Sequence, residues 1–191
     1  MTDVMERVEP VVGRDILRVN PQDRTHVFID GSNLMGMLRS SNRKLDYKLF
    51  LTFLREQTRL IRANYFVILR DDPDKRATGV IDMIEYAGFE VYRKWGHEVQ
   101  EQTGFFKFKG TIVPEMTVAI LDGVDAGAEH VIIVSGDGEF YPAIEGAKNR
   151  GARVTLISHS DSTSDDVRRA CDDFIKFEDL PEELFFSDQG R

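Results

Sequence analysis

Acidic residues follow two apolar segments of this 191-residue chain in short polar turns. The first turn, DGSN, carries Asp30 and Asn33, and the second, SGDGE, carries Asp137 and Glu139. Carboxylate and water oxygens are the ligands that Mg²⁺ and Mn²⁺ prefer, and adjacent carboxylates repel each other unless a cation lies between them. Such a metal site activates water and binds a phosphoryl group for in-line attack. If the two turns adjoin, Asp30, Asp137 and Glu139 predict phosphodiester hydrolysis with Mg²⁺ or Mn²⁺ as the cofactor.

Each acid also has an ordinary structural interpretation. Asp30 is typical of a turn, Asp137 of a helix N-cap, and Glu139 of a first helical turn, where the helix dipole favours a negative charge. The occurrence of two acid-bearing turns of similar composition favours the functional interpretation over three separate structural ones.

The elements that position these turns alternate between strands and helices. Short apolar runs predict five strands, at 26–30, 65–70, 89–92, 130–134 and 152–157. Periodicity and capping residues predict helices over 47–64, from 75 to Gly88, and over 114–126, 139–150 and 165–171. Residues 96–114 lack a helical period and predict a hairpin or a long loop. This alternation is typical of an α/β fold with a parallel sheet and helices on both faces.

In an open parallel sheet, ligands bind beyond the carboxyl ends of the strands, at the point where the strand order reverses. Both acidic turns directly follow predicted strands, 26–30 and 130–134. If these two strands are neighbours at the reversal, Asp30, Asp137 and Glu139 lie in one crevice.

A basic surface could accompany such a site. Residues 39–64 contain seven basic and two acidic residues. Arg55, Arg59 and Arg62 have i, i+4, i+7 spacing and predict a basic stripe on the helix over 47–64. Lys107 and Lys109 alternate with phenylalanines, a pattern suited to phosphate contact and base stacking. The alternative is a solvated helix face beside core phenylalanines.

Composition restricts the class of protein. The chain has 33 acidic and 25 basic residues and a net charge of −8, which argues against a protein that coats nucleic acid. Much of the acidity lies in the predicted site and in residues 172–191, so an RNA that is cut remains compatible. The single cysteine, Cys171, excludes an intramolecular disulfide. The sequence lacks a membrane-spanning apolar run and a signal-peptide pattern, so we expect a cytoplasmic protein without membrane association.

Residues 28–33, FIDGSN, resemble the opening motif of NYN domains, the LabA-like branch of the PIN-like nuclease superfamily. Residues 134–140, VSGDGEF, resemble the second motif, SGDSDF, with Gly138 and Glu139 as departures. Ser164, Val167, Asp172 and Phe174 fit the closing motif, in which Cys171 replaces an alanine.

The resemblance covers residues 26–178. It implies a Rossmann-like PIN fold with strand order 3-2-1-4-5 and a metal-dependent ribonuclease acting on RNA. Asp30, Asp137 and Glu139 would be metal ligands, and Asn33 would orient water or substrate.

One family position departs from the pattern. Such domains carry an aspartate that opens the helix before the fourth strand, and aligning on Asp122 places Met116 there. Glu115 and Asp122 are seven residues apart, so both could face the crevice as further metal ligands from one side of a helix. Glu115 is equally interpretable as a favourable charge at a helix N-terminus. These departures leave open a catalytically reduced or inactive RNA-binding or regulatory module.

Two other site classes fit less well. A von Willebrand-type adhesion module needs D-x-S-x-S, and Leu34 stands where its final serine would be. A haloacid-type phosphatase needs a second aspartate, which would fall at Ser32.

We expect residues 1–25 to be an N-terminal extension, 26–178 the NYN/PIN-like domain and 179–191 an acidic C-terminal tail. Leu184, Phe185 and Phe186 in that tail predict docking either on the domain or on a second subunit, which would make a homodimer.

Overall fold

Six parallel strands form the central sheet of the computed structural model, which describes residues 16–69, 76–100 and 106–186. They are β1 (Arg24–Asp30), β2 (Arg59–Leu69), β3 (Glu90–Trp95), β6 (His130–Val134), β7 (Arg153–Ser158) and β8 (Asp173–Lys176). Their order across the sheet is β3-β2-β1-β6-β7-β8. A separate antiparallel hairpin consists of β4 (His97–Gln100) and β5 (Phe106–Lys109). The predicted α/β architecture with a parallel sheet is confirmed.

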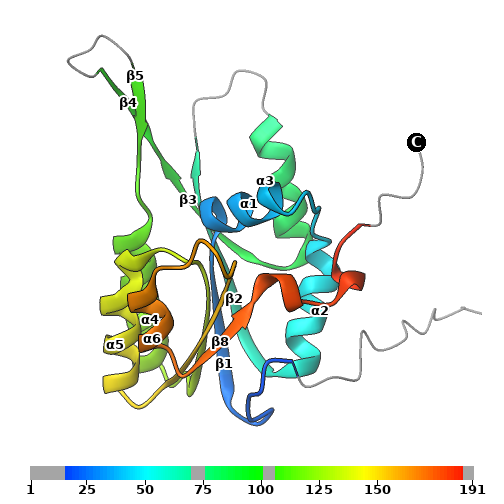
Figure 1. The fold of residues 1–191 in the computed structure, drawn as a ribbon, viewed down its shortest axis with the longest axis vertical. Helices are drawn as coiled ribbons and strands as arrows, with labels where there is room; N and C mark the ends of the chain where they lie inside the picture. Colours follow the sequence, from blue (N-terminus) through cyan, green and yellow to red (C-terminus); the bar gives the residue numbers. More distant parts are fainter. Residues whose placement is uncertain (1–15, 70–75, 101–105, 187–191) are drawn as a thin grey trace, which may run out of the picture.

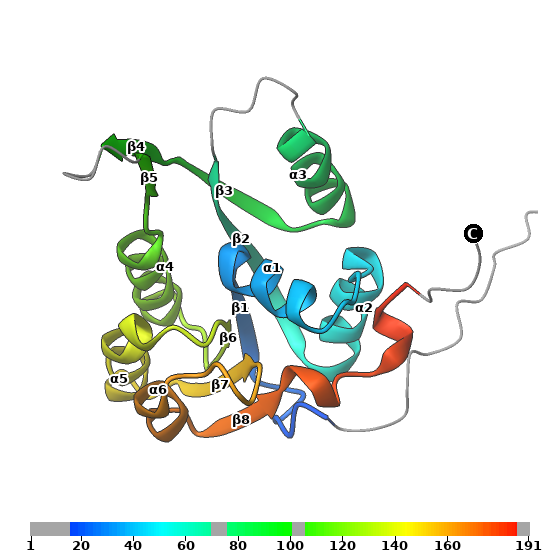
Figure 2. The ribbon, with the colours of Figure 1, turned by 45° about the horizontal axis from the view of Figure 1, so that its top comes forward.

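Helices cover both faces of the sheet in two groups, as Figures 1 and 2 show. One face carries α1 (Gly31–Ser40), α2 (Tyr47–Gln57) and α3 (Arg76–Ala87), and the other carries α4 (Val113–Asp125), α5 (Tyr141–Asn149) and α6 (Asp165–Ala170). Three short 3-10 helices are η1 (Gly138–Phe140), η2 (Phe177–Asp179) and η3 (Glu182–Leu184). Because helices lie on both sides of β6, all five of its residues are buried.

The sheet differs in detail from the predicted order 3-2-1-4-5. The hairpin β4–β5 precedes β6 in the chain, and β8 adds a sixth strand beside β7. The predicted order of five strands did not include β8. Pairing with β7 and the ion pair between Arg153 and Asp173 (2.6 Å) hold this short segment in the sheet.

The predicted helix over 47–64 is wrong in its second half. α2 ends at Gln57, Thr58 is extended, and the chain enters the 11-residue strand β2 at Arg59. The Thr58 hydroxyl donates to the Leu54 carbonyl at 2.7 Å and so satisfies a terminal group of the helix. Residues with acceptable helix propensity become a strand because β2 pairs with both β1 and β3.

The described part of the acidic tail packs against the domain. Leu184 and Phe185 are buried in the core on the α1–α3 side of the sheet, whereas Phe186 is exposed. The amide of Asp46 donates to the Leu184 carbonyl at 2.8 Å. Of the two predicted docking modes, the structure therefore shows docking on the same chain, and the core extends beyond residue 178.

None of the helices within residues 16–69, 76–100 and 106–186 combines the length and apolar character needed to cross a membrane.

We predict that Leu184→Ala lowers the free energy of unfolding by about 2–5 kcal/mol, because it leaves a cavity in the core. Phe186→Ala is the matched control, since it removes a large side chain from an exposed position and should change stability by no more than about 0.5 kcal/mol. Chemical denaturation measures both. Equal effects of the two substitutions would contradict the docking of Leu184.

His130 gives a second prediction. Burial, followed by the charge of Arg153, lowers the pKa of His130 from 6.5 to about 4. The unfolded chain therefore takes up a proton first, and the stability contributed by neutral His130 is lost as the pH falls from 6.5 towards 4. We expect His130→Gln to reduce this dependence, measured by denaturation at each pH. His97→Gln, on an exposed residue of β4, should retain it.

Candidate active site

Asp30 occupies the carboxyl end of β1, where the strand becomes helix α1. It is 5% exposed and is the N-cap of α1. Its Oδ1 accepts hydrogen bonds from the backbone amides of Ser32 (3.0 Å) and Asn33 (3.1 Å). The first predicted turn is therefore the start of a helix that the sequence analysis did not predict, and the capping interpretation of Asp30 is correct as far as the backbone is concerned.

The second carboxylate oxygen of Asp30 connects the two acidic turns. Asp30 Oδ2 accepts from the Ser135 hydroxyl at 3.2 Å, and Ser135 Oγ accepts from the Asp137 amide at 3.2 Å. Asn33 Oδ1 accepts from the Gly136 amide at 3.0 Å, which makes a parallel link. The ends of β1 and β6 are thus joined by side chains as well as by strand pairing, and the turns lie side by side as predicted.

The electrostatics of Asp30 differ from those of an ordinary helix cap. Burial raises the pKa of the Asp30 carboxyl, and the charge of Asp137 raises it further. Hydrogen bonds from Asn33, Ser135 and Ser32 oppose this effect, but the net direction is upward. Ionised Asp30 is therefore held in an unfavourable environment, chiefly because it is buried.

The donor set at these turns is compatible with a hard divalent cation. Asp30 and Asp137 supply carboxylate oxygens, and a cation would offset the repulsion by which Asp137 raises the pKa of Asp30. Mg²⁺ is commonly held through one or two carboxylates together with water and substrate phosphates, so two acids suffice. Asp30 and Asp137 would hold it.

The other predicted ligands are not gathered with this pair. Glu139 is exposed, and its backbone amide donates to Asp137 Oδ1 at 2.9 Å. Among the residues that the structure describes, no three Asp, Glu, His or Cys side chains form a potential metal-binding group. The separation arises because η1 begins at Gly138, so that Asp137 caps the short helix while Glu139 lies on its solvent side.

Glu115 and Asp122 line a different feature, a groove between α4 and the face of β1–β3. Their seven-residue spacing does place both on one helix face, as predicted. However, Lys94 Nζ contacts Glu115 Oε1 at 2.5 Å, and this hydrogen bond lowers the pKa of Glu115. Met116 is fully buried in the core beside it. Glu115 thus has a cationic partner from the protein itself.

The predicted arginine stripe does not exist. Arg55 belongs to α2, whereas Arg59 and Arg62 lie in the first half of β2, towards the edge of the sheet opposite Asp30. On β2, Arg59 comes seven residues before the residue that pairs with Asp30, which is a separation of roughly 23 Å along the strand. The side chains of Lys107 and Lys109 lie outside what the structure describes, so their predicted contact with RNA remains untested.

Two polar side chains at this edge of the sheet were not among the residues predicted for the site. Ser135 is fully buried and bridges the two acidic turns. His159 follows the end of β7 and lines a cleft with Ser32 and Asn33. Asp30, Asp137 and His159 all lie within three residues of the end of a predicted strand, so a search for polar residues at every strand end would also have selected His159.

Comparison with known proteins shows the family of this chain and supports its fold. The NYN domain family model matches residues 24–180, and the chain therefore belongs to the NYN domain family. The match includes both acidic turns and all six strands of the central sheet.

Two relatives cover most of the chain. Low amplitude and bright protein LabA of Synechococcus elongatus is 24% identical over 161 residues, or 82% of this chain and 85% of LabA. This similarity and the family match confirm the predicted LabA-like type. The crystal structure of a protein of unknown function from Vibrio parahaemolyticus has a TM-score of 0.63 at 21% identity. That match covers 88% of this chain and 99% of the other, and it supports the fold.

We predict that Asp30→Asn becomes progressively more stable than the wild type as the pH rises from the ordinary pKa of aspartate through the raised pKa of Asp30. The folded state binds the Asp30 proton more tightly than the unfolded state, so the wild type loses stability over this window. Unfolding free energies of both proteins at each pH measure the difference.

Asp46→Asn is the matched control. Asp46 accepts the same two capping hydrogen bonds, from the amides of Lys48 and Leu49 at 3.0 Å, but is only half-buried. A similar pH-dependent gain in Asp46→Asn would show that capping, rather than burial of Asp30, causes the effect.

Proposed function

We propose that this protein is a Mg²⁺- or Mn²⁺-dependent ribonuclease that hydrolyses RNA phosphodiester bonds at the carboxyl ends of β1 and β6. The observation that carries the proposal is the hydrogen-bonded connection from Asp30 through Ser135 to Asp137. It fixes the backbone of Asp137 beside the Asp30 carboxylate, which is buried and has a raised pKa. Membership of the NYN family, which resembles PIN-like nucleases, supports the same assignment.

The roles of the chain's own residues follow from their contacts. Asp30 and Asp137 supply negative charge at the strand ends, and Ser135 fixes the Asp30 carboxylate by donating to Oδ2. The side-chain carbonyl oxygen of Asn33 accepts a hydrogen bond from the Gly136 amide. The side-chain NH₂ of Asn33 is therefore the group left to orient water or a substrate phosphate. A bound divalent cation would supply activation of water and charge stabilisation at phosphorus.

A second function, an RNA-binding or regulatory module without catalysis, has one observation in its favour. At the family position where an acid is expected, Met116 is buried in the core, and the neighbouring Glu115 is paired with Lys94. Such a module would bind RNA with an affinity that falls steeply with salt and would not depend on Asp30.

Cleavage of a labelled RNA in Mn²⁺ separates the two functions. We expect the wild type to cleave, and Asp30→Asn and Asp137→Asn each to lower kcat by about 100-fold or more, since even outer-shell partners of a metal site contribute about 10–100-fold. Asp125→Asn is the control, because Asp125 is an exposed acid at the far end of α4 that pairs with Arg150.

Equal cleavage by all four proteins would contradict the proposed site. Salt-dependent RNA binding without cleavage by the wild type, unchanged in Asp30→Asn, would support the non-catalytic module.

A further inference from the structure

A polar cleft of about 540 Å³ opens beside the Asp30 site, between α1 and the loop that follows β7. It shares Ser32 and Asn33 with the turn that begins at Asp30. Its walls also include Gly36, Ser40, His159 and Ser162. The cleft therefore adjoins the position where the proposed function places the scissile phosphate.

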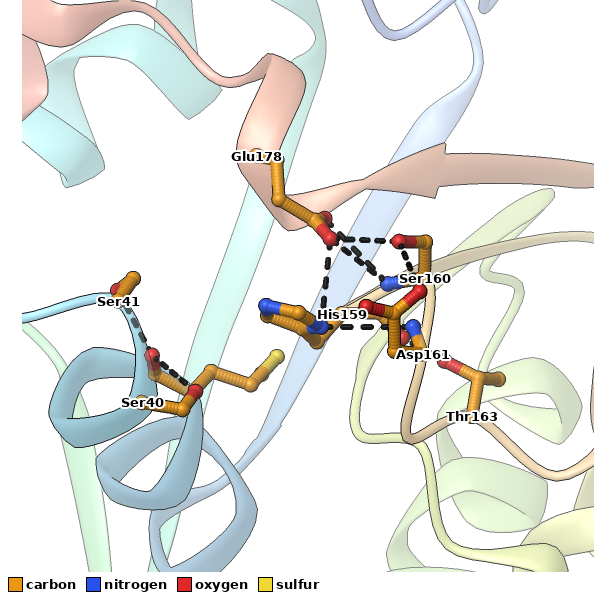
Figure 3. A network of polar contacts seen from close by, with 8 residues as sticks. Ser40, Ser41, His159, Ser160, Asp161, Thr163 and Glu178 are labelled. Carbon is orange, nitrogen blue, oxygen red and sulfur yellow. Dashed lines mark hydrogen bonds and ion pairs between the residues drawn. The ribbon is translucent and has the colours of Figure 1, made fainter.

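His159 is the residue in this cleft with proton-transfer chemistry. Figure 3 shows its ring between Glu178, which lies in η2, and the end of α1 that carries Ser40. His159 Nδ1 lies 3.3 Å from Glu178 Oε1, and the His159 side chain is 20% exposed. The other edge of the ring is directed towards α1 (Figure 3), and His159 is one of the residues lining the cleft.

Two groups lie near His159 Nδ1, and they require opposite protonation states of that nitrogen. The carboxylate of Glu178 can only accept a hydrogen bond, whereas the backbone amide of Asp161, at 3.4 Å, can only donate one. The carboxylate is the stronger partner because its hydrogen bonds are charge-assisted, and the amide contact is the longer of the two. We therefore assign the proton to Nδ1, which leaves Nε2 facing the cleft.

Glu178 is itself fixed in place. Its Oε1 accepts from the Ser160 hydroxyl at 2.7 Å and from the Ser160 amide at 3.0 Å. Burial acts to raise the pKa of Glu178, but the hydrogen bonds from Ser160 and the charge of His159 outweigh it, so that the net pKa is lowered. An ionised carboxylate thus orients the imidazole and stabilises its protonated form, the arrangement by which a third group positions a catalytic base or acid.

The charged groups around His159 are few. Glu178 comes from η2 and Asp161 from the loop after β7, whereas the α1 residues that line the cleft, among them Ser32, Asn33 and Ser40, carry no ionisable side chain. Both of these neighbouring groups are acids.

We propose that His159 is a catalytic general acid that protonates the leaving oxygen during RNA hydrolysis, with Glu178 as its positioning residue. The inference rests on the proposed ribonuclease function. Water oxygen forms a bond to phosphorus, and the bond from phosphorus to the leaving nucleoside oxygen breaks. The electron pair of that bond stays on the leaving oxygen, which takes the proton from His159 Nε2. The surplus proton of the water goes to solvent, and a solvent proton restores His159.

The test compares two substrates with one variant. On RNA in Mn²⁺, His159→Gln should lower kcat by about 10²–10⁴-fold. On a p-nitrophenyl ester of a nucleotide, whose leaving group departs without being protonated, the variant should cleave nearly as fast as the wild type. Glu178→Gln should lower kcat on RNA but not on the p-nitrophenyl ester, because the imidazole loses the carboxylate that orients it.

Two controls separate this role from a structural one. His97→Gln changes an exposed histidine of β4 and should leave both substrates unaffected. Gly36→Gln should obstruct the cleft and impair cleavage of RNA, because Gly36 lines the cleft and a Cβ at this position meets no atom within 4 Å. Gly79→Gln is its match, since Gly79 is a helical glycine of α3 with equally open surroundings.

The outcomes distinguish the two proposals. A wild type that does not cleave RNA would overturn both the ribonuclease function and the role of His159. Cleavage by the wild type that is lost in Asp30→Asn but unchanged in rate in His159→Gln would overturn only the general acid. Equal losses of His159→Gln on both substrates would also overturn it, by showing a structural role.

Discussion

The burial of the Asp30 carboxylate at the end of β1 is the constraint on which the site depends. A buried carboxylate is tolerated only when hydrogen bonds satisfy it, and Asp30 receives three, from two amides of α1 and from Ser135. Those donors come from segments about a hundred residues apart in the chain. They meet because β1 and β6 pair in parallel, with Ile29 opposite Val134, so that the next residues of both strands lie together. The start of α1, the turn after β6 and the Asp30 carboxylate therefore stabilise one another's positions.

Three acidic residues show how different the environments of a carboxylate can be within one fold. Glu115 is paired with Lys94, Glu178 lies against His159 and accepts from Ser160, and Asp30 has Asp137, a like charge, beside it. The first two carboxylates have lowered pKa values, and Asp30 has a raised one. The raised pKa of Asp30 comes chiefly from its burial, which outweighs its three hydrogen bonds, and the charge of Asp137 adds to the effect. This difference, rather than the number of acids, distinguishes Asp30 from the other two carboxylates.

The arrangement of the elements explains why this edge is available to a ligand. The strand order reverses at β1, so the chain after β1 enters α1 on one face and the chain after β6 enters α5 on the other. The two connections leave in different directions and do not cover the strand ends between them. The loop after β7 closes one side, and η2 and η3 tie the end of the chain back to the α1–α3 side of the sheet. The polar cleft with His159 lies between α1 and that loop.

The sequence by itself determined the strands, the alternation with helices and the two acidic turns, because apolar runs and capping residues act over a few neighbours. It also determined the family, through motifs that lie at those turns. Only the tertiary structure decided that residues 59–64 are strand, that residues 173–176 join the sheet, and that Leu184 completes the core. It likewise decided which acids stand together, separating Glu115 and Asp122 from Asp30 and bringing Glu178 to His159. Each of these depends on pairing or contact between distant segments, and local propensity carries no information about which distant partner a side chain will meet.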